Sequence, residues 1–139
     1  MVALDWAKVF DSINVEALVV ALRRFGVPPK LLRVVQHIYQ DRSFRVADGS
    51  LQSSERRQMS GISQGCPLSP FLFVMVMTVV VSDSICQLGE EMRRQFESGS
   101  FSVVLYADDT LVIGDRESAI QEMLNAIADV GSRFGMALH

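Results

Sequence analysis

The sequence predicts an α+β fold in which helices pack on one face of an antiparallel β-sheet. Three observations predict it. Short apolar runs typical of strands lie near both ends of the chain. Longer segments carry apolar residues at helical spacing. The predicted strands and helices do not alternate regularly, which disfavours an all-parallel sheet.

The first part of the chain predicts one strand followed by two helices. Val2–Asp5 is a short apolar run that ends in a carboxylate, as expected of a strand. Val15–Phe25 and Leu31–Tyr39 both carry apolar residues on one helical face. A Gly-Val-Pro-Pro segment separates these two helices. The candidate N-caps of the first helix are Asp11, Ser12 and Asn14.

The middle of the chain predicts a loose hairpin and one long helix. Phe44–Ala47 and Arg57–Met59 flank an Asp-Gly-Ser turn and are expected to pair. The helix begins at Ser69 or Pro70 and is expected to run to about Arg94, with Gly89 weakening it only locally.

The last part of the chain predicts a second hairpin and a final helix. Phe101–Tyr106 and Thr110–Ile113 are β-rich runs joined by a short turn that carries two aspartates. The final helix is expected over Ser118–Phe134 and ends at Gly135.

Composition restricts the class of protein. A chain of 139 residues that is 49% hydrophobic can form one domain with one core and is not a disordered acidic tail. The longest apolar run, Phe71–Val81, is shorter than a membrane span and predicts a buried helix. The start of the chain carries no secretory signal pattern, and the two cysteines form no metal-binding pair. An intracellular protein without membrane segments is expected.

The charges are unevenly distributed. Residues 23–57 contain eight basic and three acidic side chains, a net charge of +5, so the rest of the chain carries −8. This basic third has two interpretations: a surface for a phosphate backbone, or a solvated helix face.

Three aspartates form the candidate chemical centre. Asp108 and Asp109 are adjacent at the predicted hairpin tip, and Asp5 ends the first predicted strand. If these strands are neighbours, three carboxylates converge, and a cation is needed to offset their repulsion. Oxygen ligands with open positions suit Mg²⁺. The alternative is that the aspartate pair only serves the turn, since Asp favours turns.

Three short strings change the weighting of these interpretations. They are Asp5-Trp6-Ala7-Lys8-Val9-Phe10-Asp11, then Gly61-Ile62-Ser63-Gln64-Gly65-Cys66-Pro67-Leu68-Ser69-Pro70, then Tyr106-Ala107-Asp108-Asp109. Together they resemble motifs A, B and C of reverse transcriptases, in that order and at plausible spacing. The residues of these motifs are most similar to those of non-LTR retrotransposon enzymes, and nearly as similar to those of group II intron enzymes. The fold implied is a polymerase palm.

The resemblance implies a role for each matching residue. Asp5 and Asp108 would be the main ligands of two Mg²⁺ ions, for which Mn²⁺ can substitute, and Asp109 would complete the set. The backbone carbonyl of Trp6 would face a metal, and Phe10 would exclude a ribose 2′-hydroxyl. The residues implied to contact substrate are Phe10, Gln64, Gly65 and Tyr106, although Tyr106 could equally be a strand aromatic.

The resemblance also implies partners and limits. The partners would be an RNA template, a DNA primer and deoxynucleotides, in the nucleus or cytoplasm. Residues 1–139 would form a single partial domain that holds motifs A to C and the start of motif D. The fingers and thumb would be missing, so little or no activity is expected of this chain alone.

Two alternatives remain open. An RNA-dependent RNA polymerase palm carries a second Asp five positions after the first, where this chain has Phe10, and favours Gly at the position of Ala107. Both positions favour DNA synthesis. The other alternative is a catalytically inactive retroelement remnant that at most binds nucleic acid.

Overall fold

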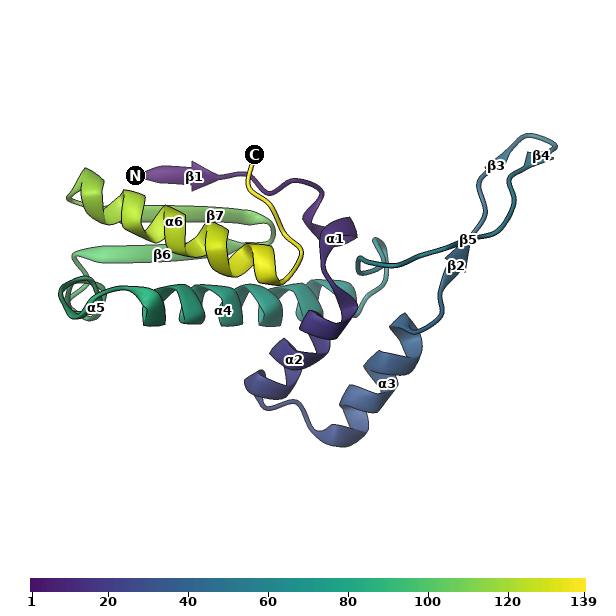
Figure 1. Cartoon of the computed structure of the whole chain (residues 1–139), viewed down its shortest axis with the longest axis horizontal. Helices are drawn as coiled ribbons and strands as arrows, with labels where there is room; N and C mark the ends of the chain where they lie inside the picture. The colour runs from purple at the N-terminus through teal and green to yellow at the C-terminus, as the bar shows by residue number, and fades with distance from the viewer.

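A three-stranded antiparallel sheet organises the fold in a computed structural model that describes all residues, 1–139. Its strands are β1 (Val2–Leu4), β6 (Phe101–Tyr106) and β7 (Asp109–Gly114), in the spatial order β1-β7-β6. The central strand β7 therefore pairs with both neighbours, although β1 comes from the opposite end of the sequence (Figure 1). This arrangement confirms the predicted antiparallel sheet.

The last residues of the chain lie against the segment that follows β1. Trp6 and Leu138 form an antiparallel bridge. The peptide N–H of Ala7 donates to the carbonyl of Ala137 at 2.9 Å, and the N–H of His139 donates to the carbonyl of Asp5 at 3.0 Å. The C-terminus therefore lies beside the end of β1 that leads into Asp5, whereas the N-terminus lies at the start of β1 (Figure 1).

Helices α4 (Ser69–Gln87) and α6 (Glu117–Arg133) cover one face of the sheet (Figure 1). They contribute many of the buried side chains of a single core of 29 residues. Thr110 and Val112 of β7 point into this core, whereas Asp109, Leu111 and Ile113 alternate with them and point to the uncovered face. The large core side chains that α4 and α6 contribute include Phe73, Met77, Val80, Met123 and Ile127. The predicted fold class, with helices on one face, is confirmed.

Three helices follow β1 before the chain reaches the arm. They are α1 (Val9–Ser12), α2 (Val15–Phe25) and α3 (Pro29–Tyr39). The side chain of Asn14 caps α2 by accepting from the N–H groups of Glu16 and Ala17. Gly26 ends α2 with a φ of 96°, in the left-handed region that glycine adopts most easily.

A narrow arm extends from the body between α3 and α4 (Figure 1). It consists of two short ladders, β2 (Ser43–Phe44) with β5 (Arg56–Arg57) and β3 (Ala47–Asp48) with β4 (Leu51–Gln52). All eight of these strand residues are exposed. The predicted hairpin and its Asp-Gly-Ser turn are confirmed, but Phe44 pairs with Arg56 and Met59 lies outside the ladder.

Two sequence predictions are wrong. The long helix does not run to Arg94: α4 ends at Gln87, and a separate helix α5 (Glu90–Glu97) begins after Gly89. Leu88, in extended backbone with a ψ of 148°, interrupts the helical path and is itself buried. Asp11 is also not a helix cap, because it lies inside the short helix α1 and Asn14 caps α2.

Helix α4 has the length and mean hydropathy of a membrane span, with a mean hydropathy of 1.8 over its best window. A helix in the core of a soluble protein can have the same length and hydropathy, and eight residues of α4 are buried.

Candidate active site

Asp5 and Asp109 meet at one end of the sheet. The register of β1 and β7 pairs Leu4 with Thr110, so the next residues along, Asp5 and Asp109, lie across from each other. Leu4 and Thr110 are buried against the helices, which leaves Asp5 and Asp109 on the uncovered face. The predicted proximity of the first strand to the hairpin tip is therefore observed in the backbone.

Asp108 lies at the tip itself, in a two-residue turn between β6 and β7. Tyr106 pairs with Asp109, and Ala107 and Asp108 form the turn. Ala107 adopts a φ of 51°, which is uncommon for a residue with a Cβ atom. Such strained positions concentrate at functional sites. We call Asp5, Asp108 and Asp109 the acidic edge.

The uncovered face beside the acidic edge is apolar. Tyr106 lies opposite Asp109 on this face and is 79% exposed. Val104 and Ile113 share the face and are 49% and 38% exposed. The alternation along β6 is clear, because Val103 and Leu105 pack on the core between these exposed residues. Exposed apolar side chains and the carboxylates of the acidic edge therefore share one face of the sheet.

Trp6 supports the acidic edge from below. Its ring is 4% exposed, and its Nε1 donates to the Oγ1 of Thr110 at 3.2 Å, which ties the residue after Asp5 to the residue after Asp109. The bonds to the C-terminal segment use the peptide groups of Asp5 and Ala7 and leave the carbonyl of Trp6 without a backbone partner.

A pocket of about 570 Å³ lies beside Phe10 and the start of α4. Its wall includes Gln64 and Gly65, and we call residues 61–68 the pocket loop. Gly65 has a φ of 80° and open space where a Cβ atom would be, so a ligand can approach its backbone closely. The Nε2 of Gln64 donates to the Oδ1 of Asp11 at 3.4 Å. The structure thus brings together three residues predicted to contact substrate.

Phe10 packs against the core and also lines the pocket. One side of its ring stacks on Phe73 of α4, with centroids 4.7 Å apart and planes 27° from parallel. The same residue also lines the pocket with Gln64 and Gly65. Core packing therefore holds the ring in place at the pocket wall.

The pocket loop is joined to the segment after Asp5 by backbone bonds. The N–H of Gly61 donates to the carbonyl of Ile13 at 2.7 Å, and the N–H of Ile62 donates to that of Phe10 at 2.6 Å. A Cβ atom on Gly61 would lie 2.8 Å from the carbonyl oxygen of Asp11, so this close approach requires glycine. The second sequence string is thus held directly against the first.

Sequence reasoning missed Arg42. Its Nη1 donates to the Oγ of Ser63 at 2.7 Å, and its Nη2 donates to the carbonyl of Gly61. These are the first residues of the pocket loop. A single arginine in a basic segment gives no signal of such a role, because its partners are a backbone oxygen and a serine.

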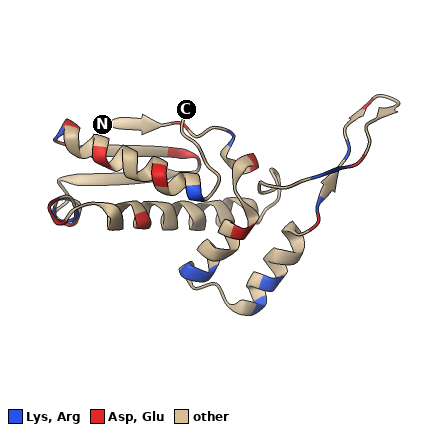
Figure 2. Cartoon of the chain, viewed as in Figure 1, with Lys and Arg blue, Asp and Glu red and all other residues tan.

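The eight basic residues of segment 23–57 lie on α2, on α3 and in the arm, away from the acidic edge (Figure 2). Three of the eight pair with acidic side chains, in the pairs Arg24–Asp83, Arg45–Glu55 and Arg57–Asp41. The bidentate bond from Arg24 lowers the pKa of the Asp83 carboxyl below its ordinary value and raises the pKa of the guanidinium. These pairs favour the solvated-surface interpretation for part of the basic third.

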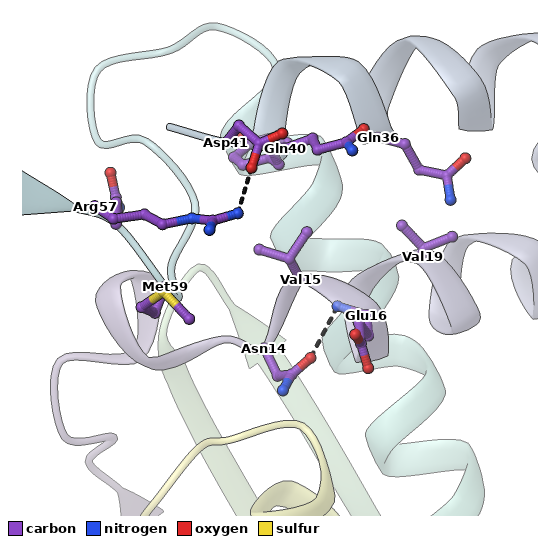
Figure 3. A pocket seen from close by; sticks show the side chains of 11 residues that line it. Asn14, Val15, Glu16, Val19, Gln36, Gln40, Asp41, Arg57 and Met59 are labelled. Carbon is purple, nitrogen blue, oxygen red and sulfur yellow. Dashed lines mark hydrogen bonds and ion pairs between the residues drawn. The ribbon is translucent and has the colours of Figure 1, made fainter. Parts of the chain in front are cut away.

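The largest cavity, about 610 Å³, lies elsewhere, between α2, α3 and the base of the arm (Figure 3). Figure 3 shows Gln36, Gln40 and Met59 around it, with the Arg57–Asp41 pair on one side. None of the predicted site residues lines it. Size therefore does not identify the candidate site, and the carboxylates and the motif residues do.

The acidic edge fits a divalent cation by its donor chemistry. In this conformation no group of three or more His, Cys, Asp and Glu side chains is arranged to hold a metal ion. Carboxylates at one edge repel each other without a cation, so divergent side chains are expected. Exposed carboxylates on converging strands, with one free carbonyl beside them, are ligands that Mg²⁺ accepts while it keeps several waters.

The fold first defines the class of protein, a polymerase palm. The structure is similar to that of apo telomerase from Candida tropicalis truncated from its C-terminal domain, with a TM-score of 0.73 over 99% of this chain and 28% of that chain. The identity is 15%, so this likeness concerns the fold.

The family follows from the sequence comparison. Residues 1–139 match the family of reverse transcriptases (RNA-dependent DNA polymerases), and the chain belongs to this family. This result confirms the resemblance and disfavours the RNA polymerase alternative. The family generally uses divalent metal ions and binds a nucleic-acid template and primer.

Two similar proteins come from a retrotransposable element and a mobile element. The chain is 26% identical over 136 residues to the Retrovirus-related Pol polyprotein from type-2 retrotransposable element R2DM of Drosophila melanogaster, covering 98% of this chain and 12% of that protein. It is 28% identical over 130 residues to the RNA-directed DNA polymerase from mobile element jockey of the same species, covering 88% and 13%. The chain thus spans about an eighth of these relatives.

Proposed function

We propose that this chain is the catalytic palm of a non-LTR retrotransposon reverse transcriptase, with Asp5, Asp108 and Asp109 as its metal-binding carboxylates. The β1–β7 register, which sets Asp5 across from Asp109 on the uncovered face, is the single observation that carries this proposal. A pair of turn aspartates alone would not require a third acid from a strand near the other end of the sequence.

The acidic edge would hold two divalent ions, Mg²⁺ with Mn²⁺ as a substitute. When bound, such ions activate a primer 3′-hydroxyl and neutralise charge on the departing pyrophosphate. Asp5 and Asp108 are the proposed main ligands, Asp109 completes the set, and the unpaired carbonyl of Trp6 is a further oxygen donor. In the strand register, Asp109 lies across from Asp5, whereas Asp108 lies one residue further along in the turn.

The pocket loop and Phe10 would select the incoming deoxynucleotide. Gln64 and Gly65 offer an amide and an accessible backbone at the pocket wall. The Phe10 ring, backed by Phe73, would exclude a 2′-hydroxyl by occupying its space. The apolar face around Tyr106 would support the primer end, and an RNA template would complete the complex.

Primer extension on poly(rA)/oligo(dT) with Mg²⁺ tests the proposal. In the longest form of the protein that contains this domain, we expect Asp108→Asn, Asp109→Asn and Asp5→Asn each to reduce dTTP incorporation at least about 100-fold, because a neutral amide is a poorer Mg²⁺ ligand. Asp115→Asn is the matched control: it makes the same change on an exposed residue beyond the opposite end of β7.

Two outcomes would contradict this assignment in different ways. Full extension by Asp108→Asn and Asp109→Asn would show that the acidic edge is not catalytic. Nucleic-acid binding by the wild type without Mg²⁺-dependent extension would instead support the inactive remnant. The 139-residue chain alone, assayed in parallel, is expected to extend weakly or not at all.

A further inference from the structure

Arg42 connects the base of the arm to the pocket loop. It lies just beyond α3, where the arm begins, and bonds to two residues of the loop, Ser63 and Gly61. Its guanidinium also lies over the ring of Tyr39, 4.4 Å from the ring centroid. This combination of two hydrogen bonds and an aromatic face fixes the plane of the guanidinium.

Tyr39 and Ser69 extend this arrangement into the core. The hydroxyl of Tyr39 lies 3.2 Å from the Oγ of Ser69, and that Oγ donates to the carbonyl of Ser63 at 2.6 Å. Tyr39 and Ser69 are 2% and 1% exposed. Ser63 is therefore held twice, through its hydroxyl by Arg42 and through its carbonyl by the first residue of α4.

The result is a loop fixed at its first residues and open at the next ones. Residues 61 and 62 are bonded to the segment around Phe10, and residues 61 and 63 are bonded to Arg42. Gln64 and Gly65 follow at once and are exposed at the pocket wall. The position of these two residues thus depends on the bonds made just before them.

The geometry of Arg42 requires arginine. The Nε of Arg42 is the one buried side-chain nitrogen or oxygen in the chain that lacks a hydrogen-bond partner. The two hydrogen bonds and the aromatic contact of the guanidinium are therefore made through its Nη groups and its face. A lysine offers one point charge and cannot reach both acceptors while it stacks on Tyr39.

We infer that Arg42 is a positioning residue of the substrate pocket: through Ser63 and Gly61 it holds Gln64 and Gly65 where they meet the substrate. The identity of that substrate as a deoxynucleotide rests on the proposed function. The positioning itself rests on the bonds described above and can be measured without any polymerase activity.

The reaction of Cys66 with a thiol reagent reports on the pocket loop. Cys66 is half-buried within the loop, and the other cysteine, Cys86, is exposed on α4. In a Cys86→Ser background, we expect Arg42→Gln to raise the rate of Cys66 modification by 5,5′-dithiobis(2-nitrobenzoate) about tenfold, because two charge-assisted bonds are lost. Arg45→Gln is the matched control, since Arg45 bonds only to Glu55 in the arm.

Two further measurements separate loop release from general unfolding. Ser63→Ala removes the acceptor of one Arg42 bond without a change in backbone, and we expect a smaller increase in the same rate. The rate of Cys86 modification in a Cys66→Ser background should not change with Arg42→Gln. Equal Cys66 rates in wild type, Arg42→Gln and Arg45→Gln would overturn the inference, as would a parallel rise at Cys86.

A kinetic split tests the consequence for the substrate. In the longest active form, we expect Arg42→Gln to raise the KM for dTTP about tenfold with a smaller change in kcat. Arg42→Lys, which keeps the charge, should raise the KM less than Arg42→Gln does. An unchanged KM would contradict the link to substrate. If dTTP with Mg²⁺ fails to protect Cys66 in the wild type while Arg42→Gln still raises its rate, the proposed function fails and the loop positioning stands.

Discussion

Phe10 is a residue of the core for which we also propose a role in substrate selectivity. Its ring stacks on Phe73 and lines the pocket. We expect Phe10→Ala to reduce discrimination against ribonucleotides by about tenfold or more, because the ring no longer fills the space of a 2′-hydroxyl. Competition between dTTP and UTP in primer extension measures this ratio.

The same substitution must be compared with one outside the pocket. Phe25→Ala removes an aromatic ring that is 48% exposed at the end of α2. We expect it to leave the ratio unchanged. If both variants keep the wild-type ratio, Phe10 is a core residue only. Loss of stability by Phe10→Ala, about 3 kcal/mol in urea unfolding, is expected in either case.

Gly61 shows how one missing side chain allows two motifs to meet. Its φ is 90°, and a Cβ atom would lie within 2.9 Å of two backbone atoms of Asp11. We expect Gly61→Ala to destabilise the fold by about 2–4 kcal/mol, the sum of backbone strain and overpacking. Urea unfolding followed by circular dichroism gives this value.

Gly49→Ala isolates the contribution of the clash. Gly49 has a φ of 58° in the arm turn, with open space around its Cα. Its replacement carries the backbone strain alone, about 1 kcal/mol. Similar losses in the two variants would show that the Gly61 contact yields easily.

The residues of the candidate site differ in how far the sequence predicts them. The acidic edge could be predicted because a strand pairing needs only apolar runs and their ends, and Asp5 and Asp109 fall at such ends. Arg42 could not, because its importance lies in acceptors on Ser63 and Gly61 that no side-chain pattern reveals. Local chemistry is visible in a sequence, whereas the partners of a long flexible side chain are not.

At the level of elements, clear periodicity gave the best predictions. The predicted bounds of α2, Val15–Phe25, are those observed, because a strong cap and a terminal glycine enclose the helix. The break after α4 was missed, since one glycine costs a helix only about 1 kcal/mol and does not normally end it. At this point Leu88 is buried in extended backbone, and the helix ends before it.

The contact between α2 and α4 includes an ion pair that responds to pH. Arg24 bonds to both carboxylate oxygens of Asp83, and this bond lowers the Asp83 pKa, to which Arg133 also contributes. A lowered folded-state pKa stabilises the fold above the unfolded pKa and loses that contribution as the pH falls through the folded value. Stability from this pair therefore declines only in acid.

Asp83→Asn tests this dependence. Arg24 is half exposed, so we expect the variant to lose only about 0.5 kcal/mol at neutral pH. The difference from wild type should shrink toward zero below the ordinary pKa of 3.8. Chemical unfolding at several pH values measures it, and a difference that grows in acid would contradict the assignment.

At the scale of the whole molecule, the arm and the body differ in stability. The strand residues of the arm are all exposed and lie in ladders of two residues per strand, whereas the body shares one core of 29 residues. Segments with few buried contacts open locally at low free-energy cost. We therefore expect trypsin to cleave first in the arm, at Arg45, Arg56 or Arg57.

Mass spectrometry of the earliest fragments gives the order of cleavage. Lys8, Arg93 and Arg116 are exposed basic residues outside the arm and serve as internal controls. First cuts at those residues would mean that the body opens before the arm. Persistence of the body's circular dichroism after arm cleavage would show that the core does not require the arm.

The backbone around Asp5 contacts two parts of the chain that are distant in sequence. Its carbonyl accepts from the N–H of His139, while its own strand adjoins β7 on the other side. A disturbance in the final residues would therefore shift the first carboxylate through peptide geometry alone, with no intervening side chain. Distance along the sequence is a poor guide to which substitutions impair catalysis in such a molecule, and a screen should include residues 136–139.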